Sequence, residues 1–199
     1  MEQEEVWDAI APVWNKVKTR VDEDSVKFLK GESGKILDFG CGSGRNFSAF
    51  SVESKIYGID FSKEMLKLAE KNAKKKGLWF KAIYSDSDKI GLDDDFFDSE
   101  ICVAVLHCVK GMEKRRGILS ELYRVLKPGG KALISVWSRN SPRLKNRDKE
   151  TFVSWTSAGV KERYTYIYDF EEFVGDLKSV GFEILNVEEG MNIVAVVEK

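Results

Sequence analysis

The residues with the clearest chemical meaning form a glycine turn. Gly40, Gly42 and Gly44 alternate directly after a short apolar run at Lys35–Phe39. Glycines between a strand and the element that follows it let the backbone approach a ligand closely. The next apolar run ends in Asp60, about 20 residues after the first of these glycines. A carboxylate at that place accepts hydrogen bonds from both hydroxyls of a ribose, so the spacing predicts a nucleoside site.

The acidic residue Asp38, just before the turn, indicates which nucleoside binds there. Nicotinamide enzymes use a similar turn, but theirs holds a pyrophosphate and usually has its third glycine one position later. A carboxylate beside the turn repels phosphates and attracts the ammonium of an amino acid. S-adenosylmethionine (SAM) carries an amino acid and a sulfonium and has no phosphate. Asp38 and the early Gly44 therefore favour SAM as the ligand.

Four segments, in order, resemble the motifs of class I SAM-dependent methyltransferases. Leu37–Gly44 is similar to their first motif, and Asp60 within Gly58–Ser62 matches their ribose-binding acid. Asp86 matches the acid at the adenine edge, and Leu126–Gly130 is similar to the segment before their fifth strand. The resemblance implies that the SAM contacts are Asp38, Gly40, Cys41, Gly42, Gly44, Asn46, Asp60, Phe61, Ser62, Asp86, Ser87 and Val103.

Other segments resemble the eukaryotic wobble-uridine tRNA carboxyl methyltransferases, and together they cover nearly all of the chain. This resemblance implies methyl esterification of a 5-carboxymethyl group on uridine 34 of tRNA. The sequence departs from the family pattern at Cys108, which replaces a histidine, and at Ser154, which replaces a proline. The similar segments are Ile10–Pro12 with Arg20, Ala104–His107, Glu113–Arg116, Val136–Trp137, Phe152–Trp155 and Arg163–Tyr168.

A carboxylate acceptor sets simple requirements for such a site. It has a pKa near ~4 and is ionised at neutral pH, so it needs no general base. It must be positioned, partly desolvated and held by a cation or by neutral donors. Arginine holds a carboxylate or a phosphate in bidentate fashion, and aromatic rings stack on a base. We expect the catalytic group to be His107, Arg20, Arg163 and Tyr164, and the substrate-binding group to be Trp137, Arg143 and Arg147.

Several of these features have a purely structural alternative. The segment Arg139–Lys149 carries five cations and one anion, which suits contact with phosphates but also suits an ordinary solvated loop. His107, the only histidine, either contacts substrate or makes a simple hydrogen bond. Trp7 and Trp14 either pack an N-terminal lid or touch substrate. Tyr164–Tyr168 alternates like a strand, so at least half of its rings are expected in the core.

Apolar runs that alternate with helical segments predict an α/β fold. Such strands pair as a mostly parallel, Rossmann-like sheet with helices on both faces. The last two runs are separated by a short connection at Glu188–Met191, which favours an antiparallel C-terminal hairpin at the sheet edge. The seven expected strands are Lys35–Phe39, Lys55–Asp60, Trp79–Tyr84, Ile101–Val105, Lys131–Trp137, Phe182–Val187 and Asn192–Val197.

Helical periodicity and chain length favour one domain over residues 1–199. Within it we expect an N-terminal helical lid at 1–31 and a substrate-side insert at 138–163. The expected helices are Glu4–Lys18 with a kink at Pro12, Asp22–Lys30, a helix from Arg45, Ser62–Lys76, Met112–Leu126 and Asp169–Val180.

Composition excludes several classes of protein. The net charge of −1 at pH 7 means that any nucleic-acid contact comes from a local patch. No apolar run approaches the roughly 18 residues of a membrane span, and the acidic N-terminus is unlike a signal peptide. We therefore expect a cytoplasmic protein without membrane contact. Three cysteines without CxxC spacing and a single histidine predict no protein-built metal site.

The family resemblance also implies two partners, tRNA and a small zinc-binding methyltransferase activator protein. The activator is expected on the sheet edge at Phe80, Ala82, Ile83 and Tyr84, unless a helix buries these residues. Two other functions stay open. One is a small-molecule methyltransferase of the quinone type, where Ala104–His107 also occurs; the arginine-rich insert favours RNA over this alternative. The other is a catalytically silent partner protein that binds SAM.

Overall fold

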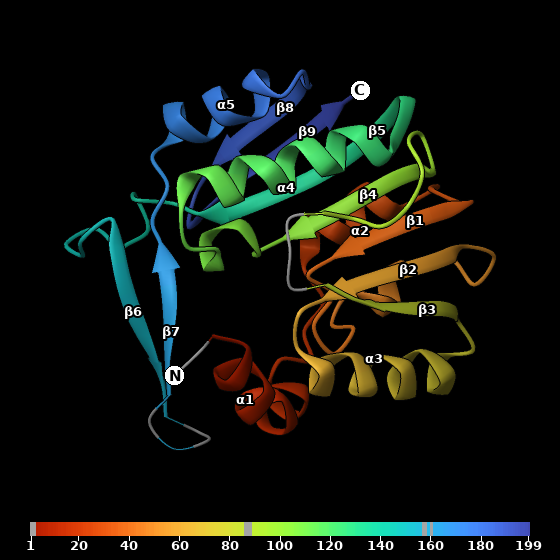
Figure 1. The fold of residues 1–199 in the computed structure, drawn as a ribbon, viewed down its shortest axis with the longest axis horizontal. Coiled ribbons are helices and arrows are strands. Elements are labelled where there is room, and N and C mark those ends of the chain that lie inside the picture. The colour runs from red at the N-terminus through yellow and green to blue at the C-terminus, as the bar shows by residue number, and fades with distance from the viewer. Residues whose placement is uncertain (1–2, 86–88, 157–158, 160) are drawn as a thin grey trace. The chain divides into compact units, whose positions relative to one another are not determined.

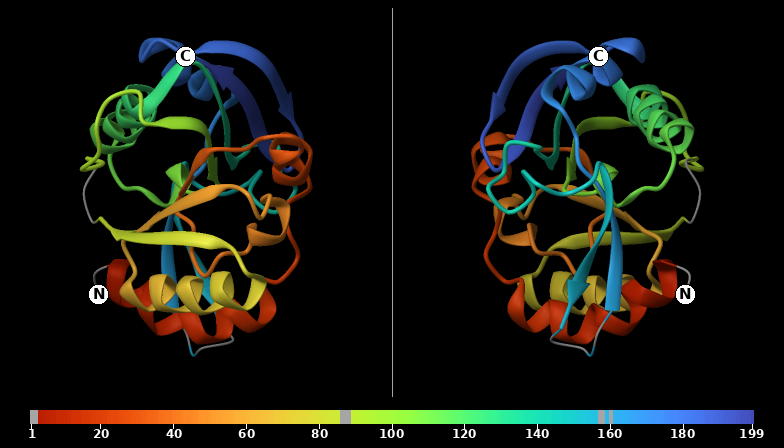
Figure 2. Two further views of the ribbon diagram at one scale, coloured as in Figure 1. Left: turned by 90° about the vertical axis from the view of Figure 1, so that its right-hand side faces the viewer. Right: turned by 90° about the vertical axis from the view of Figure 1, so that its left-hand side faces the viewer.

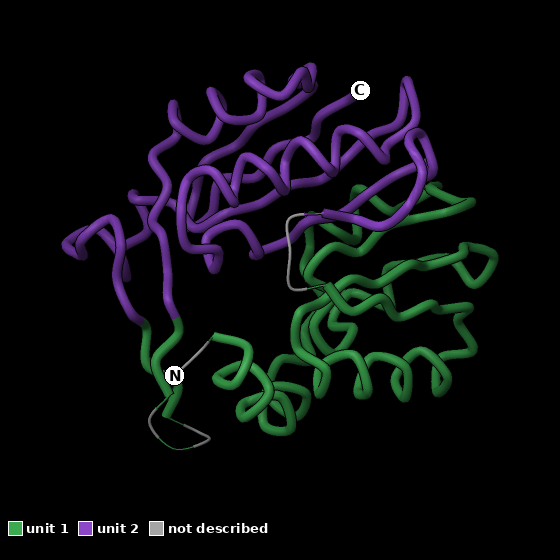
Figure 3. The backbone as a smooth tube through the Cα atoms, viewed as in Figure 1, with its two compact units in different colours: residues 1–86, 153–163 green, residues 87–152, 164–199 purple. Residues whose placement is uncertain are grey.

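A computed structural model describes residues 3–85, 89–156, 159 and 161–199 of the chain. These residues form two compact units, coloured separately in Figure 3. Unit 1 comprises residues 1–86 and 153–163, and unit 2 comprises residues 87–152 and 164–199. No helix within the described ranges is long and apolar enough to cross a membrane.

Three parallel strands form the sheet of unit 1. Strands β1 (Lys35–Phe39), β2 (Lys55–Asp60) and β3 (Trp79–Tyr84) lie in the order β3-β2-β1 (Figure 1). The strands β1 and β2 run in step, with Phe39 opposite Ile59. Their carboxyl ends therefore reach the same edge of the sheet. This places the glycine turn after β1 beside the carboxylate that ends β2.

Two helices of unit 1 pack against each other. Helices α1 (Gln3–Val17) and α3 (Lys63–Lys76) lie side by side in both views of Figure 2. Helix α1 continues through Pro12 and buries an apolar face that includes Ile10. Helix α3 begins after the predicted cap Ser62, whose hydroxyl accepts the first-turn N–H of Met65 at 3.1 Å. Helices α1 and α3 thus share one packed face.

The segment after the glycine turn departs from the prediction. The expected helix from Arg45 is wrong, because only the short 3₁₀ helix η1 (Phe47–Ala49) forms there. The N–H of Gly44 already bonds a carbonyl three residues back, as in a 3₁₀ turn, and the same pattern continues through η1. The predicted helix before β1 is confirmed as α2 (Glu23–Leu29), with Asp22 as its cap.

Four strands form the sheet of unit 2, in the order β4-β5-β9-β8. They are β4 (Phe97–Val103), β5 (Leu126–Trp137), β9 (Asn192–Glu198) and β8 (Glu183–Glu189). Strands β4 and β5 are parallel, while β9 is antiparallel to both β5 and β8. The fold is therefore the predicted seven-stranded, mostly parallel sheet with an antiparallel C-terminal hairpin.

The strands β4 and β5 differ in detail from their predicted bounds. Strand β5 begins at Leu126, before the predicted start at Lys131. Its pairing steps from Phe97 opposite Leu126 directly to Ser99 opposite Lys131, so the Lys-Pro-Gly-Gly segment bulges out of the ladder. Proline has no N–H to donate to a strand ladder, which agrees with a bulge at this segment. Strand β4 ends at Val103, earlier than predicted.

Two helices and a further hairpin complete the described chain. Helices α4 (Met112–Val125) and α5 (Phe170–Ser179) contact each other in unit 2, close to their predicted bounds. Strands β6 (Glu150–Trp155) and β7 (Lys161–Tyr166) form a separate two-stranded sheet. Most of this region falls in the predicted insert at 138–163, and the pairing of the two strands was not predicted.

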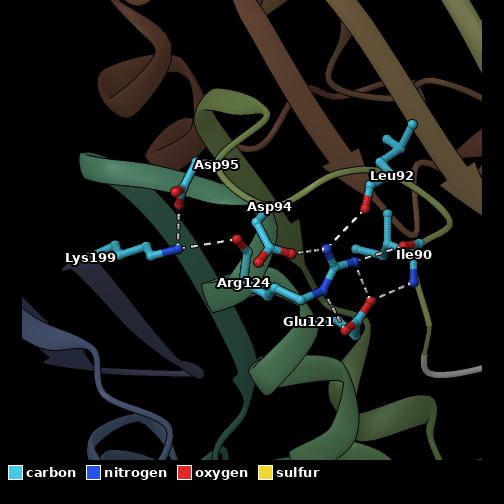
Figure 4. A network of polar contacts seen from close by, with 7 residues as sticks. All are labelled: Ile90, Leu92, Asp94, Asp95, Glu121, Arg124 and Lys199. Carbon is cyan, nitrogen blue, oxygen red and sulfur yellow. Dashed lines mark hydrogen bonds and ion pairs between the residues drawn. The ribbon is translucent and has the colours of Figure 1, made fainter.

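A polar network in unit 2 joins the C-terminus to the end of α4 (Figure 4). The Lys199 ammonium donates to the Arg124 carbonyl at 3.1 Å and to Asp95 at 2.6 Å. The guanidinium of Arg124 donates at 2.6–2.9 Å to the carbonyls of Ile90 and Leu92 and to the carboxylates of Glu121 and Asp94. One side chain therefore satisfies two carbonyls and one carboxylate of the loop before β4, and one carboxylate within α4.

Arg124→Met should lower the free energy of unfolding by about 2–4 kcal/mol, because two backbone carbonyls and two carboxylates lose their donor. Urea denaturation followed by circular dichroism measures this change. Arg143→Met is the matched control, since Arg143 is exposed and makes no ion pair with a described residue. It should change stability by less than about 0.5 kcal/mol. Equal midpoints for the two variants would show that the network is not stabilising.

Candidate active site

The glycine turn of unit 1 has a backbone conformation that residues with a side chain rarely adopt. Gly42 and Gly44 have φ values of 54° and 82°, in the left-handed region. A Cβ at Gly44 would lie 2.2 Å from the Phe47 ring, so a side chain does not fit there. The two glycines therefore keep the turn tight and its backbone accessible.

Asp60 ties this turn to the end of β2. Its carboxylate accepts the N–H of Gly42 at 2.8 Å and the N–H of Ser62 at 2.9 Å. The carboxyl is 8% exposed, and burial raises its pKa to about 6, against the lowering effect of N–H donors from Ser62, Gly42 and Phe61. The structure thus brings the predicted ribose-binding residues and the turn into direct contact.

Asp38 is the second buried carboxyl beside the turn. It is 3% exposed, and its Oδ2 has no hydrogen-bond partner among the described residues. Burial raises the pKa of Asp38 to about 7, while the charge of Arg45 opposes the rise and the charge of Asp60 adds to it. A buried acceptor without a partner is costly unless a ligand supplies a donor. The ammonium of SAM is such a donor, so these residues fit this cofactor.

Cys41 lies within the turn and is buried. Burial, with the nearby charges of Asp38 and Asp60, raises the pKa of its thiol. The thiol is therefore protonated at neutral pH and unsuited to nucleophilic chemistry. Its predicted part in cofactor binding rests on its backbone, whose N–H donates to the Ile59 carbonyl at 3.0 Å.

A tryptophan cluster of Trp7, Trp14 and Trp155 covers this region of unit 1. Trp14 packs on both other rings, with centroid separations of 5.2 Å. Its Nε1 lies 3.9 Å from the position that a Cβ on Gly42 would take. The guanidinium of Arg163 is 5.3–5.7 Å from all three ring centroids and is 8% exposed. The cluster thus holds a buried cation and also reaches the glycine turn.

The structure gives two predicted site residues other contacts. Arg20 is exposed and forms an ion pair with Glu23, three residues further along the chain. Asn46 is 5% exposed, and its side-chain oxygen accepts the N–H of Asp22 at 3.3 Å. Asn46 therefore connects η1 to the start of α2. These contacts bring neither residue to Asp60 or to Arg163.

His107 lies in unit 2, in the 3₁₀ helix η2 (Leu106–Cys108) after β4. It is 2% exposed, and its ring stacks on Trp137 with centroids 4.5 Å apart and planes 21° apart. The guanidinium of Arg143 lies 6.0 Å from the Trp137 centroid. Three residues predicted for the acceptor side therefore gather within unit 2.

A strained residue at the end of β4 was not predicted from the sequence. Ala104 has a φ of 62°, and its N–H donates to the carbonyl and the hydroxyl of Ser135, at 3.1 and 3.2 Å. Non-glycine residues in this conformation are uncommon and gather at functional sites. Val103, a predicted cofactor contact, directly precedes it and is 8% exposed. The predicted contacts Asp86 and Ser87 lie outside the described residues.

The predicted insert has more order than a solvated loop. Leu144 is buried within it, and Lys149 pairs with Asp169 at 2.8 Å and with Glu172 at 2.9 Å. Arg139 also reaches Asp169, at 3.6 Å. Two of its five cations are therefore neutralised by partners. The cations without an ion pair to any described residue are Arg143, Lys145 and Arg147.

Tyr164 is buried in unit 2, at 3% exposure. Its ring meets Phe152 edge-on at 6.1 Å, and burial raises its pKa to about 12. Tyr166 and Tyr168 are buried too, with the Arg115 guanidinium 3.6 Å from the Tyr166 ring. The expectation that at least half of these rings lie in the core is confirmed. In this structure Tyr164 packs on protein and leaves little surface for a base.

Sequence comparisons relate the chain to methyltransferases. Residues 37–134 match the methyltransferase domain family. The chain is 30% identical to a tRNA (carboxymethyluridine(34)-5-O)-methyltransferase of Arabidopsis thaliana, over 85% of this chain and 38% of that protein. It is 30% identical to an Encephalitozoon cuniculi protein provisionally named a methyltransferase, over 82% and 78% of the two. A 2-phytyl-1,4-naphtoquinone methyltransferase of Nostoc punctiforme is 29% identical, over 100% and 98%. The chain thus spans less than two fifths of the Arabidopsis relative.

Solved structures share the fold. A SAM-dependent methyltransferase of Methanosarcina mazei superposes with a TM-score of 0.75 at 22% identity, over 90% of this chain and 98% of that one. A chain from the complex of the Haloferax volcanii Trm112 methyltransferase activator with a methyltransferase gives 0.73 at 16% identity, over 98% and 95%. These likenesses confirm the predicted Rossmann-like methyltransferase fold.

The raised pKa values predict that SAM affinity falls in acid. Asp38 and Asp60 have pKa values of about 7 and about 6, and a cationic ligand favours their ionised forms. Protonation below these values competes with binding, so affinity should drop by up to about tenfold per pH unit below about pH 7, and more steeply below about pH 6, where both carboxyls take up protons. Calorimetric titrations between about pH 8 and about pH 5 measure this.

Asp38→Asn is the control for this pH dependence. It should bind SAM more weakly at neutral pH, with a flatter profile near pH 7, because the group that titrates there is gone. The remaining fall should begin near the pKa of Asp60, at about 6. An affinity that is constant across the whole range in the unaltered protein would contradict the assignment of both carboxyls.

Proposed function

Because this chain belongs to the SAM-dependent methyltransferases and uses SAM as its cofactor, we propose that its methyl acceptor is 5-carboxymethyluridine at wobble position 34 of tRNA. The Arabidopsis relative named for this reaction is 30% identical over 85% of the chain. The segments around Arg163 and Phe152–Trp155 resemble the same family. The product would be a methyl ester on the carboxymethyl group.

The chemistry asks little of the protein in acid–base terms. SAM supplies a methyl group activated by its sulfonium. The acceptor carboxylate is ionised at neutral pH, with a pKa near ~4, so no residue has to remove a proton. The protein must align the acceptor, exclude water and balance the carboxylate charge. This matches a site in which Cys41 is a buried neutral thiol and no base is required.

The observation that carries the proposal is the buried guanidinium of Arg163 within the tryptophan cluster. Trp14, a member of that cluster, also lies against the glycine turn at Gly42. A guanidinium binds a carboxylate through two parallel hydrogen bonds. Indole rings around it exclude water, and electrostatic attraction is stronger where the local dielectric is low. An anionic acceptor gains from this cation, and a neutral one does not.

A quinone-type acceptor is the second candidate. The Nostoc relative matches the whole chain at 29% identity. The tryptophan cluster also offers ring faces on which a flat aromatic acceptor would stack. The buried charge of Arg163 favours the carboxylate over this alternative.

Exposed cations of unit 2 support an RNA acceptor. Arg143, Lys145 and Arg147 lie within a few residues of one another and make no ion pair with a described residue. Cations of this kind bind phosphates and release counterions, which gives affinity without reading sequence. They would hold phosphates of the tRNA backbone.

We also propose an activator protein as partner, docked on the edge strand β3. Strand β3 has β2 as its one neighbour in the described sheet, and Trp79 and Tyr84 are 46% and 39% exposed. Exposed edge strands with large apolar side chains are suited to strand pairing with another protein. Phe80 packs on Phe47 with centroids 4.9 Å apart, so it would support the strand from within.

Labelled SAM and tRNA that carries 5-carboxymethyluridine should give a base-labile methyl ester. Arg163→Lys should lower kcat/KM for tRNA by about tenfold to a hundredfold, because lysine keeps the charge but loses the paired donors. Its affinity for SAM should be unchanged. Alkali-released label, measured with and without an activator protein, reports the ester.

A naphthoquinol is the competing acceptor in the same assay. Transfer to the naphthoquinol, with none to tRNA even in the presence of the activator, would replace the carboxylate assignment with the quinone one. Full activity of Arg163→Lys on tRNA would remove Arg163 from the acceptor site and leave the reaction itself intact.

Reversing the charge of Arg143 and Arg147 to Glu should weaken tRNA binding about tenfold or more at low salt. The dependence of log Kd on log salt should flatten by about two, because two phosphate contacts are lost. Lys71→Glu with Lys74→Glu on the exposed side of α3 makes the same charge change elsewhere. Filter binding over a salt series compares them, and equal losses for both pairs would show a net-charge effect only.

A further inference from the structure

Asp8 connects helix α1 to the first turn of α3, within unit 1. Its Oδ1 accepts the hydroxyl hydrogen of Ser62 at 2.5 Å and the N–H of Glu64 at 3.2 Å. Asp8 and Ser62 are 54 residues apart in the chain. A carboxylate at the start of a helix is favoured by the free N–H groups there and by the helix dipole. Asp8 thus acts on α3 from a different helix.

The contact continues from Ser62 to the ribose-binding carboxylate. Ser62 is fully buried, and its hydroxyl donates to Asp8 while accepting the N–H of Met65 at 3.1 Å. Its backbone N–H donates to Asp60 Oδ1 at 2.9 Å. The Ser62 hydroxyl therefore both donates and accepts a hydrogen bond. These bonds hold the turn at residues 60–62 and so the orientation of the Asp60 carboxylate. Ser62 therefore bridges the two carboxylates, because its hydroxyl donates to Asp8 and its backbone N–H donates to Asp60.

A second contact ties the same two helices to the glycine turn. The side-chain N–H₂ of Asn72 in α3 donates to Asn15 of α1 at 2.7 Å and to the carbonyl of Ser43 at 2.8 Å. Helix α1 is thus joined to both halves of the cofactor site. One contact is at the turn after β1, and the other is at the turn after β2.

We propose that Asp8 is a positioning residue for the cofactor, which holds the turn at residues 60–62 so that Asp60 faces the ribose hydroxyls of SAM. The inference rests on the proposed placement of the ribose at Asp60. Without Asp8, the Ser62 hydroxyl loses its acceptor and the N–H of Glu64 loses its side-chain partner. The turn then samples other conformations, and the ligand must order it on binding.

Charge provides a second signature of this role. The negative charge of Asp8 raises the pKa of Asp60 in addition to the larger effect of burial. The other titratable groups that interact with Asp60 are Asp38 from β1 and Cys41 from the turn. Asp8→Asn leaves these groups in place, keeps an oxygen that accepts both hydrogen bonds and removes only the charge.

The experiment compares Asp8→Ala, Asp8→Asn and Asp60→Ala by calorimetric titration with SAM alone, well below the unfolding temperature of each variant. Asp8→Ala should bind SAM about tenfold more weakly, since it loses two hydrogen bonds to a charged group. Asp8→Asn should stay within about threefold at about pH 8, and its acid-side loss of affinity should move to lower pH. Glu5→Ala, which removes an exposed carboxylate from the same helix, should bind as the unaltered protein does.

Two results would overturn the proposal, and they are distinguishable. If Asp8→Ala melts at a lower temperature but binds SAM normally while Asp60→Ala binds weakly, Asp8 is only a helix cap. If Asp60→Ala also binds normally, the ribose assignment fails and the Asp8 proposal fails with it. Because no tRNA is present, the result is independent of the proposed methyl acceptor.

Discussion

The hydrogen bond from the Gly42 N–H to the Asp60 carboxylate is the contact on which the candidate site depends. It joins the ends of two parallel strands that meet at one sheet edge because β1 and β2 run in register. Gly42 makes this bond from a left-handed backbone conformation that few other residues adopt without strain. Strand register, the glycine and the acid therefore form one constraint, and a change in any of them displaces the others.

Unit 1 buries three ionisable side chains near this contact, although burying such groups lowers the stability of the fold. Asp38 and Asp60 are both buried, and burial raises the pKa of each. The Arg163 guanidinium is buried as well, among three indole rings. Desolvating a charge costs free energy that a folded protein recovers only through partners or through a ligand. A cationic cofactor would add an opposite charge beside the two carboxyls, and an anionic acceptor would add one beside the guanidinium of Arg163.

The sequence predicted those elements that are determined by residues close together in the chain. The buried runs at β1 and β2, the glycine turn and the cap Ser62 each follow from a few neighbouring residues. The helix expected from Arg45 is wrong because successive 3₁₀ turns continue from Gly44 through η1. The pairing of β6 with β7 and the role of Asp8 depend on residues far apart in the chain, and a single sequence gives no signal for such contacts. Trp155 belongs to the segment Phe152–Trp155, which resembles the tRNA carboxyl methyltransferases. Only the structure shows that its ring packs on Trp14.

Helix α1 carries residues that face both halves of the proposed reaction. Asp8 bonds to the turn beside Asp60, while Trp7 and Trp14 enclose Arg163. One helix therefore contacts both the turn beside Asp60, where the ribose is proposed to bind, and the proposed acceptor cation. Any shift of the helix along its axis would change both contacts together, since Asp8 and Trp14 belong to the same rigid element. The contact at Ser62 and the contact at Arg163 are therefore linked through α1.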